Sequence, residues 1–272
     1  MNKEQGSPYA IETADLRFSY DRRQVLGGVD LVVEAGTFCC LLGPNGSGKS
    51  TLIQLLSGAL DSDSGVVKIF GKNIDLWDRR DLARTVAVVP QQFEVAFPFT
   101  VQQVVLLGRV PHQGPWALDK KLDLDIAKQA MADTGVLQLA SRRISEISGG
   151  ELKRVVVAKA LAQQPRLLLL DEPAAHLDIK HQVDLYALVD RIRKNTGVAV
   201  LAAVHDLNLS SAFGEKFCLL KNGRLAASGT LESVMTYKNL KEVFGIDIYV
   251  GVNEITGHRL FTPMVPGQRV EL

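Results

Sequence analysis

The feature that most constrains this chain is a glycine-rich run directly after a short apolar segment. Residues Phe38–Leu42 are all apolar, which is typical of a parallel strand buried on both faces. The next residues, Gly43 to Ser50 (GPNGSGKS), match the pattern G-x-x-x-x-G-K-[ST]. Residues 50–57 then carry a helical apolar pattern. A strand, a tight turn and a helix in this order begin a βαβ unit, so we expect an α/β fold.

This run has the chemistry of a phosphate-binding loop. Its glycines allow successive backbone N–H groups to converge on one anion, and the following helix directs its positive dipole end to the same point. Lys49 is expected to reach the β- and γ-phosphates, and the Ser50 hydroxyl to bind Mg²⁺. The pattern therefore predicts a nucleoside triphosphate site formed by Gly43, Pro44, Asn45, Gly46, Ser47, Gly48, Lys49, Ser50 and Thr51.

A pair of carboxylates follows a second apolar run. Four leucines, residues 167–170, predict a buried strand, and Asp171 and Glu172 come directly after it. Ligands of open α/β sheets bind at the carboxyl ends of the strands. We expect Asp171 to bind Mg²⁺, directly or through water, and Glu172 to act as the general base on the attacking water. The alternative is an acidic pair that caps a helix.

The remaining chain alternates strand and helix, with one interruption. Strands are expected at 11–20, 29–34, 86–89 and 198–204, and helices at 101–107, 118–139, 151–163 and 180–194. The apolar positions of the 118–139 helix are Leu122, Leu124, Ile126 and Ala130. We expect a single domain over 9–245, with a core lobe (9–91 and 149–235), a helical subdomain of about 92–148, and a C-terminal extension (236–272).

Composition excludes some classes of function. The 272 residues include 31 Lys and Arg against 30 Asp and Glu, so no bulk positive charge is available for binding nucleic acid. Apolar runs such as 198–204 are far shorter than the roughly 20 residues of a membrane span. The N-terminal residues 1–12 lack the apolar segment of a signal peptide, so a cytosolic chain is expected. The three cysteines, Cys39, Cys40 and Cys218, are expected to be buried free thiols.

A further motif gives a resemblance to a known family. Residues 147–151 read Ile-Ser-Gly-Gly-Glu, which resembles the L-S-G-G-Q signature of ATP-binding-cassette ATPases, with departures at Ile147 and Glu151. The resemblance extends over residues 9 to about 235. It implies the ABC ATPase fold of P-loop NTPases, which has a β-rich N-terminal part, a RecA-like core and an α-helical subdomain.

The resemblance implies a homodimer with two shared ATP sites. Ser148, Gly149 and Gly150 open a helix and would bind the ATP held by the partner's phosphate loop; alternatively they form a plain helix N-cap. Asp178 matches the loop that crosses the dimer interface. Tyr20 matches the aromatic residue that stacks on adenine, or it is an ordinary strand tyrosine.

The resemblance also assigns residues around the γ-phosphate. Gln91, rather than the adjacent Gln92, matches the glutamine that contacts Mg²⁺ and water. His205 matches the histidine that contacts the γ-phosphate. The expected catalytic residues are thus Glu172, His205 and Gln91, the expected metal ligands are Ser50, Gln91 and Asp171, and the expected cofactors are ATP and Mg²⁺.

Residues 96–112 indicate which class of ATP-binding-cassette ATPase the chain resembles. Their T-V…V…L-G-R-x-P run is similar to cassette subunits of bacterial importers for iron–siderophore complexes, haem or cobalamin. The resemblance implies separate membrane permease subunits, a solute-binding protein as an indirect partner, and a peripheral location on the cytoplasmic face of the cell membrane. Phe93, Phe97 and Phe99 are expected either to dock the permease or to pack inside the helical subdomain.

Rival functions are a cassette ATPase outside transport and a P-loop kinase or GTPase. Against a GTPase, the chain has no N-K-x-D guanine-reading run.

Overall fold

The glycine-rich run leaves the carboxyl end of a strand in the middle of a six-stranded sheet. The computed structural model describes residues 7–94, 97–114 and 121–265. The order of the sheet is β11-β10-β4-β9-β8-β7, and β11 alone is antiparallel to its neighbour. Its strands are β4 (Phe38–Leu42), β7 (Val86–Val89), β8 (Leu167–Asp171), β9 (Ala199–Ala203), β10 (Lys216–Lys221) and β11 (Arg224–Gly229).

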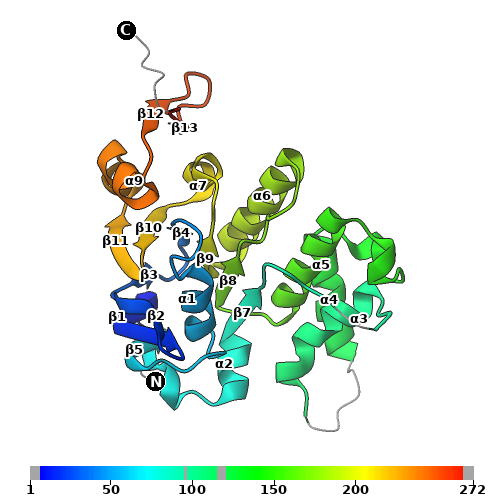
Figure 1. Cartoon of the computed structure of the whole chain (residues 1–272). Coiled ribbons are helices and arrows are strands. Elements are labelled where there is room, and N and C mark those ends of the chain that lie inside the picture. Colours follow the sequence, from blue (N-terminus) through cyan, green and yellow to red (C-terminus); the bar gives the residue numbers. More distant parts are fainter. Residues whose placement is uncertain (1–6, 95–96, 115–120, 266–272) are drawn as a thin grey trace.

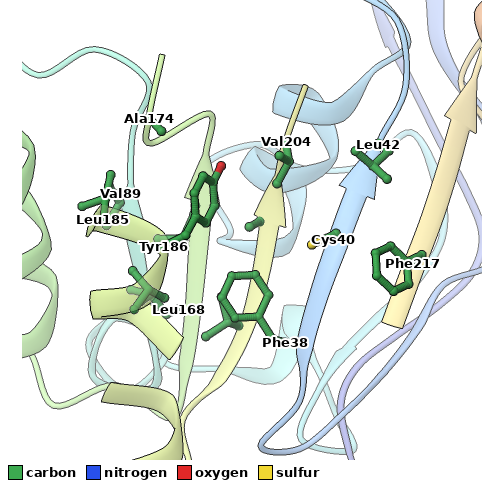
Figure 2. Packing of buried hydrophobic residues seen from close by; sticks show 14 of the residues in the cluster. Phe38, Cys40, Leu42, Val89, Leu168, Ala174, Leu185, Tyr186, Val204 and Phe217 are labelled. Carbon is green, nitrogen blue, oxygen red and sulfur yellow. The ribbon is translucent and has the colours of Figure 1, made fainter. Parts of the chain in front are cut away.

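Alternate residues of β4 point into two separate parts of the core. Cys39 and Leu41 pack with α1 and the N-terminal sheet, whereas Cys40 and Leu42 pack with α5 and α6. Figure 2 shows Phe38, Cys40 and Leu42 of β4 in one cluster with Tyr186 of α6. All five residues of β4 are buried, as the apolar run predicts. The helices that flank the sheet are α1 (Lys49–Leu56), α2 (Arg79–Thr85), α6 (Ile179–Thr196) and α7 (Leu207–Phe213), with a 3₁₀ turn at Ile74–Leu76.

A second, antiparallel sheet is built from the N-terminal part. Its strands are β1 (Tyr9–Tyr20), β2 (Arg23–Val29), β3 (Val32–Glu34), β5 (Ser64–Ile69) and β6 (Lys72–Asn73). The single strand predicted over 29–34 is wrong, because β2 ends at Val29 and β3 begins at Val32. At the break, side chains replace backbone groups as hydrogen-bond partners: the Asp30 carboxylate accepts the Asp15 amide, and the Thr13 hydroxyl of β1 accepts the Leu31 amide.

Three helices form a separate lobe with its own apolar cluster (Figure 1, green). They are α3 (Val101–Leu106), α4 (Lys121–Asp133) and α5 (Gly149–Ala162), joined by 3₁₀ turns at Leu107–His112, Leu137–Leu139 and Ile144–Glu146. The long helix predicted over 118–139 is shorter than expected: it ends at Asp133, and residues 118–120 lie outside the described residues.

The buried face of α4 also differs from the prediction. Leu122 is 64% exposed and Leu124 is 38% exposed, although both were expected to face the core. The buried side chains of α4 are Asp123, Ala127, Ala130 and Met131. A charged residue therefore occupies a core-facing position, which an apolar pattern cannot reveal.

The buried charge of Asp123 is matched by Arg109 of the 107–112 turn. The Arg109 Nε donates to Asp123 Oδ1 at 2.9 Å, and its Nη1 donates to the Ala162 carbonyl at 2.7 Å and to Gln164 Oε1 at 3.0 Å. The two charged side chains are 4% and 6% exposed. The pair thus joins the turn to both α4 and the end of α5.

We expect Arg109→Met to lower the free energy of unfolding by about 3 kcal/mol, because the buried Asp123 carboxylate loses the guanidinium that donates to it at 2.9 Å. The control is Arg17→Met, which removes an exposed pair with Asp15 (42% and 65% exposed) and should cost under about 1 kcal/mol. Urea denaturation followed by circular dichroism measures both. Equal effects of the two substitutions would contradict the assignment.

Helix α5 belongs to both lobes. Val155 and Ala158 pack in the cluster of the helical lobe, whereas Val156 and Val157 pack in the main core. A displacement of α5 therefore involves both lobes at once.

The C-terminal residues pack on the main core. They form α8 (Leu231–Val234), α9 (Tyr237–Phe244) and a hairpin of β12 (Ile248–Val252) and β13 (Arg259–Pro263). Leu240, Val243 and Phe261 share the cluster of the six-stranded sheet. In the described ranges we find no helix with the length and apolar content of a membrane span.

Candidate functional site

The loop between β4 and α1 is shaped by two glycines. Gly48 precedes α1 with a φ of 105°, a left-handed conformation that favours glycine. A Cβ on Gly43 would lie 2.1 Å from the Leu220 carbonyl oxygen of β10, so no side chain fits there. Asn45 and Gly46 at the tip are exposed, whereas Ser47 and Thr51 are buried. The loop is thereby held against the sheet with its amides turned around one point.

Two polar side chains mark this loop as a binding site. The Lys49 ammonium is buried and donates to the carbonyls of Gly43 at 2.9 Å and Pro44 at 3.3 Å. Burial lowers the pKa of Lys49, and the carboxylates of Glu172 and Asp171 partly oppose that shift. Among the described residues, the Ser47 hydroxyl is the buried side-chain polar atom that has no hydrogen-bond partner. A donor of this kind normally indicates a missing ligand or water.

The loop meets the carboxyl end of β8 through a side-chain hydrogen bond. The Ser50 Oγ donates to Asp171 Oδ1 at 2.9 Å. Burial raises the pKa of Asp171, and the bond from Ser50 opposes the shift. A hydroxyl and a carboxylate side by side are oxygen ligands of the kind that Mg²⁺ prefers, with phosphate oxygens and water completing the shell. In the part of the chain that is described, no three His, Cys, Asp or Glu side chains form a metal cluster on their own. The residues therefore fit Mg²⁺ bound together with a phosphate ligand.

Glu172 is the centre of a cluster of side chains. Its Oε2 accepts the Gln91 amide at 2.9 Å, its Oε1 lies 2.5 Å from His205 Nε2, and the same oxygen lies 3.9 Å from the Lys49 ammonium. Its backbone has a φ of +47°, which is uncommon for a residue with a side chain and is often found at functional sites. The Glu172 amide donates to the Ala203 carbonyl of β9 at 3.2 Å.

The cluster brings together residues from four segments. Gln91 follows β7, Glu172 follows β8, His205 follows β9, and Lys49 follows β4. Because these strands are neighbours and parallel, their carboxyl ends lie along one edge of the sheet. Of the two adjacent glutamines, Gln91 is the one with a described contact to Glu172, so Gln91 remains our choice for the functional glutamine. Its role as a metal ligand stays a prediction.

Tyr20 lies at the end of β1, where the N-terminal sheet reaches the loop. Its ring is 47% exposed, stands edge-on to Phe18 at 4.8 Å between centroids, and its hydroxyl donates to Gln54 Oε1 of α1 at 3.2 Å. An exposed ring held beside α1 is compatible with stacking on a base.

The Ser-Gly-Gly turn opens α5 at a different place. Ser148 is the N-cap of α5. Its hydroxyl accepts the Glu151 amide at 3.3 Å and donates to the Glu151 carboxylate at 2.9 Å. The Ser148 amide also donates to that carboxylate, and this bond lowers the pKa of Glu151. Ser148 and Gly149 are exposed. The chain's own α1 and phosphate loop lie in the other lobe, apart from this turn (Figure 1).

Asp178 caps α6 beside that turn. Its carboxylate accepts the His181 amide at 2.9 Å, and the His181 Nδ1 lies 2.7 Å from Asp178 Oδ2. The bond from the His181 amide, followed by that from its ring, lowers the pKa of Asp178. A Cβ on Gly150 would lie 2.9 Å from His181 Cδ2, so the Ser-Gly-Gly turn and the Asp178 loop touch. His181 was missed in the sequence, because a lone histidine on a helix carries no signal.

The three phenylalanines after Gln91 serve different purposes. Phe93 packs against both core clusters, and Phe99 packs in the helical lobe. Phe97 is 67% exposed and meets Phe99 at 6.1 Å between ring centroids. Packing therefore accounts for Phe93 and Phe99, and docking of the permease stays a prediction for Phe97.

Comparisons with known proteins agree with this site. A family model described as ABC transporter matches residues 26–175. The chain is 42% identical over 250 residues to the hemin import ATP-binding protein HmuV of Streptomyces coelicolor, covering 91% of this chain and 88% of that one. It is 38% identical over 238 residues to the iron(3+)-hydroxamate import ATP-binding protein FhuC of Bacillus subtilis, covering 88% of each. It spans 55% of a longer relative, the uncharacterized ABC transporter ATP-binding protein YvrA of Bacillus subtilis.

Solved structures share the fold over most of its length. A transporter assigned to the metal-chelate type of ABC transporter, in an inward-facing conformation, superposes with a TM-score of 0.84 at 26% identity over 95% of this chain and 98% of that one. The dimeric ATP-binding cassette MJ0796, bound to ADP and Pi after hydrolysis, superposes with a TM-score of 0.72 at 26% identity over 81% of this chain and 98% of that one. Sequence motifs, site geometry and relatives thus agree that the chain belongs to the ABC transporter family.

Proposed function

We propose that the chain is the ATP-hydrolysing subunit of a binding-protein-dependent importer for iron chelates, haem or cobalamin. The observation that carries the ATPase assignment is the contact of Glu172 with Gln91 and His205 beside the Lys49 loop. The two curated importer subunits, at 38–42% identity over most of their length, support the class of cargo.

Hydrolysis is a direct attack of water on the γ-phosphorus. Glu172 is 13% exposed and held by two partners, so its carboxylate is positioned to accept the proton of that water. Lys49 and the loop amides neutralise the charge of the transferred phosphoryl group. Ser50 and Asp171 would hold Mg²⁺, which supplies further neutralisation of the β- and γ-oxygens. His205, 42% exposed and in contact with Glu172 Oε1, would contact the γ-phosphate.

Two protomers would enclose two ATP molecules. Each ATP would lie between the Gly43–Ser50 loop of one protomer and the Ser148–Gly150 turn of its partner. The exposure of that turn and its separation from the chain's own loop support this arrangement, as does the dimeric state of the cassette MJ0796. The γ-phosphate then stabilises the closed dimer and its hydrolysis permits opening.

The helical lobe would transmit this motion to a permease at the cytoplasmic face of the membrane, with the solute-binding protein on the other side. Phe97, Leu107 and Val110 are exposed apolar residues near the start of this lobe (67%, 42% and 55%). Exposed apolar side chains of this kind are typical of protein interfaces.

The test is a substitution that separates hydrolysis from transport. Phe97→Asp should leave the ATPase rate of the isolated subunit unchanged and reduce uptake by at least about tenfold, because a buried unpaired carboxylate at an interface costs more than 1.4 kcal/mol. The control is Ile255→Asp, which changes a 95% exposed residue of the C-terminal hairpin loop. Uptake of radiolabelled ferric siderophore, haem and cobalamin is measured in a strain deleted for the gene and complemented with each variant. Unchanged uptake of all three in the deletion strain would favour a role outside this transport class.

A further inference from the structure

The turn that would bind the partner's ATP is connected to this chain's own Glu172 by a short series of contacts. Lys153 lies on α5, five residues after Ser148, and its ammonium donates to the carbonyl oxygen of Gln91. The side chain of the same Gln91 donates to Glu172 Oε2 at 2.9 Å. One residue thus touches α5 through its backbone and the catalytic carboxylate through its side chain.

A second contact makes this connection stiffer. The Lys159 ammonium lies 5.0 Å from the ring centroid of Phe93, two residues after Gln91, in a cation–π arrangement. Phe93 also packs against both core clusters. The segment 91–93 is therefore attached to α5 at two places one and a half turns apart, so rotation of the helix has to move Gln91.

The contact between α5 and the backbone of Gln91 depends on one charged group, the Lys153 ammonium. Lys153 is partly buried, and this burial lowers the pKa of its ammonium. Its neighbour Arg154 faces the other way and pairs with Asp184 of α6 at 3.4 Å. From the first turns of α5, Lys153 thus reaches the segment after β7.

We propose that Lys153 is a positioning residue that couples the two ATP sites of the dimer, by transmitting occupancy of the Ser148–Gly150 turn to Gln91 and so to Glu172 of the same chain. This inference rests on the proposed function, because the ligand of the turn is the ATP of the partner. When that ATP is bound, α5 is held in one position, and Gln91 orients the Glu172 carboxylate. When it is absent, α5 is no longer fixed by a ligand, so the contact between Gln91 and Glu172 is held less firmly.

Mixed dimers test the proposal. One protomer carries Lys153 or Lys153→Met and has the only functional hydrolytic site. Its partner carries either Glu172→Gln, which binds ATP without turnover, or Lys49→Ala, which lacks the phosphate-binding ammonium. The rate with the Glu172→Gln partner divided by the rate with the Lys49→Ala partner measures how strongly the partner's ATP promotes hydrolysis. We expect a ratio of about ten or more with Lys153, a coupling typical of allosteric proteins, and a ratio near one with Lys153→Met.

Two further variants separate coupling from folding. Lys153→Arg keeps a cationic donor and should restore most of the ratio. Lys128→Met, on an exposed position of α4, should leave it unchanged. Lys153→Met should also keep the ATP affinity of the wild-type monomer and lower kcat without raising KM, which a general loss of structure would not do.

The possible failures are distinguishable. A wild-type ratio of one would overturn the coupling, whereas the two-protomer ATP site itself is tested separately by mixed dimers of Ser148→Arg and Glu172→Gln. A large ratio that persists in Lys153→Met would overturn the inference alone, because coupling would then be shown to bypass this residue.

Discussion

Glu172→Gln should reduce ATP turnover by about 10²–10⁴-fold, the usual contribution of a positioned general base. The amide keeps the shape of the side chain and one acceptor oxygen for the Gln91 amide at 2.9 Å, but it cannot take a proton from water. The phosphate loop is unchanged, so ATP binding should persist. Because the γ-phosphate is no longer cleaved, dimers should accumulate with ATP and Mg²⁺, and gel filtration with a phosphate-release assay measures both effects.

The matched control is Glu34→Gln, at an exposed carboxylate of β3 that pairs with Lys216. It should leave turnover and the monomer–dimer distribution unaltered. If the Glu172 variant retained wild-type turnover, the proton acceptor would have to be sought elsewhere in the cluster.

Ser148→Arg should remove hydrolysis in the partner's site rather than in the chain that carries it. The substitution places a long side chain on the turn that would approach the partner's γ-phosphate. It also deletes the N-cap hydroxyl that accepts the Glu151 amide, which costs about 1 kcal/mol of helix stability. The homodimer should therefore lose nearly all turnover and still bind ATP as a monomer.

Complementation in mixed dimers shows in which protomer the turn acts. With Ser148→Arg on one protomer and Glu172→Gln on the other, both lesions fall in the same composite site and the second site is complete. We expect about a tenth to a half of the wild-type rate, the lower figure allowing for loss of coupling between sites. With both substitutions on the same protomer, each site has one lesion and turnover should be close to zero. The reverse pattern would show that the turn serves its own chain.

Much of the site could be predicted because its chemistry depends on short segments. The apolar runs before Gly43 and Asp171 each form a strand buried on both faces, and their carboxyl ends place the polar residues that follow. His205 also follows an apolar strand, β9, but its role was implied by the family resemblance rather than by that position. At these positions the apolar sequence pattern and the order of strands in the sheet both place the polar residue at the carboxyl edge.

The features that escaped prediction depend on contacts between distant segments. The buried face of α4 includes Asp123, which pairs with Arg109 of another turn, so hydrophobic periodicity identified Ala130 but missed Asp123 and wrongly included Leu122. Lys153 looks like any surface lysine on an amphipathic helix until Gln91 is placed beside it. Phe97 and Phe99 are two residues apart and have opposite environments, which only the packing of the helical lobe decides.

Because all three cysteines are buried, the native chain should not react with thiol reagents while it is folded. Cys39 and Cys40 lie in the central strand and Cys218 in the neighbouring one, each at most 1% exposed, and burial raises the pKa of the Cys40 thiol. Maleimides should therefore modify them only when the sheet opens, so labelling kinetics report on global unfolding. A single cysteine introduced at Lys128, on the exposed face of α4 in the helical lobe, can then carry a fluorophore without prior removal of the native thiols. Movement of the helical lobe during each ATP cycle becomes observable in real time.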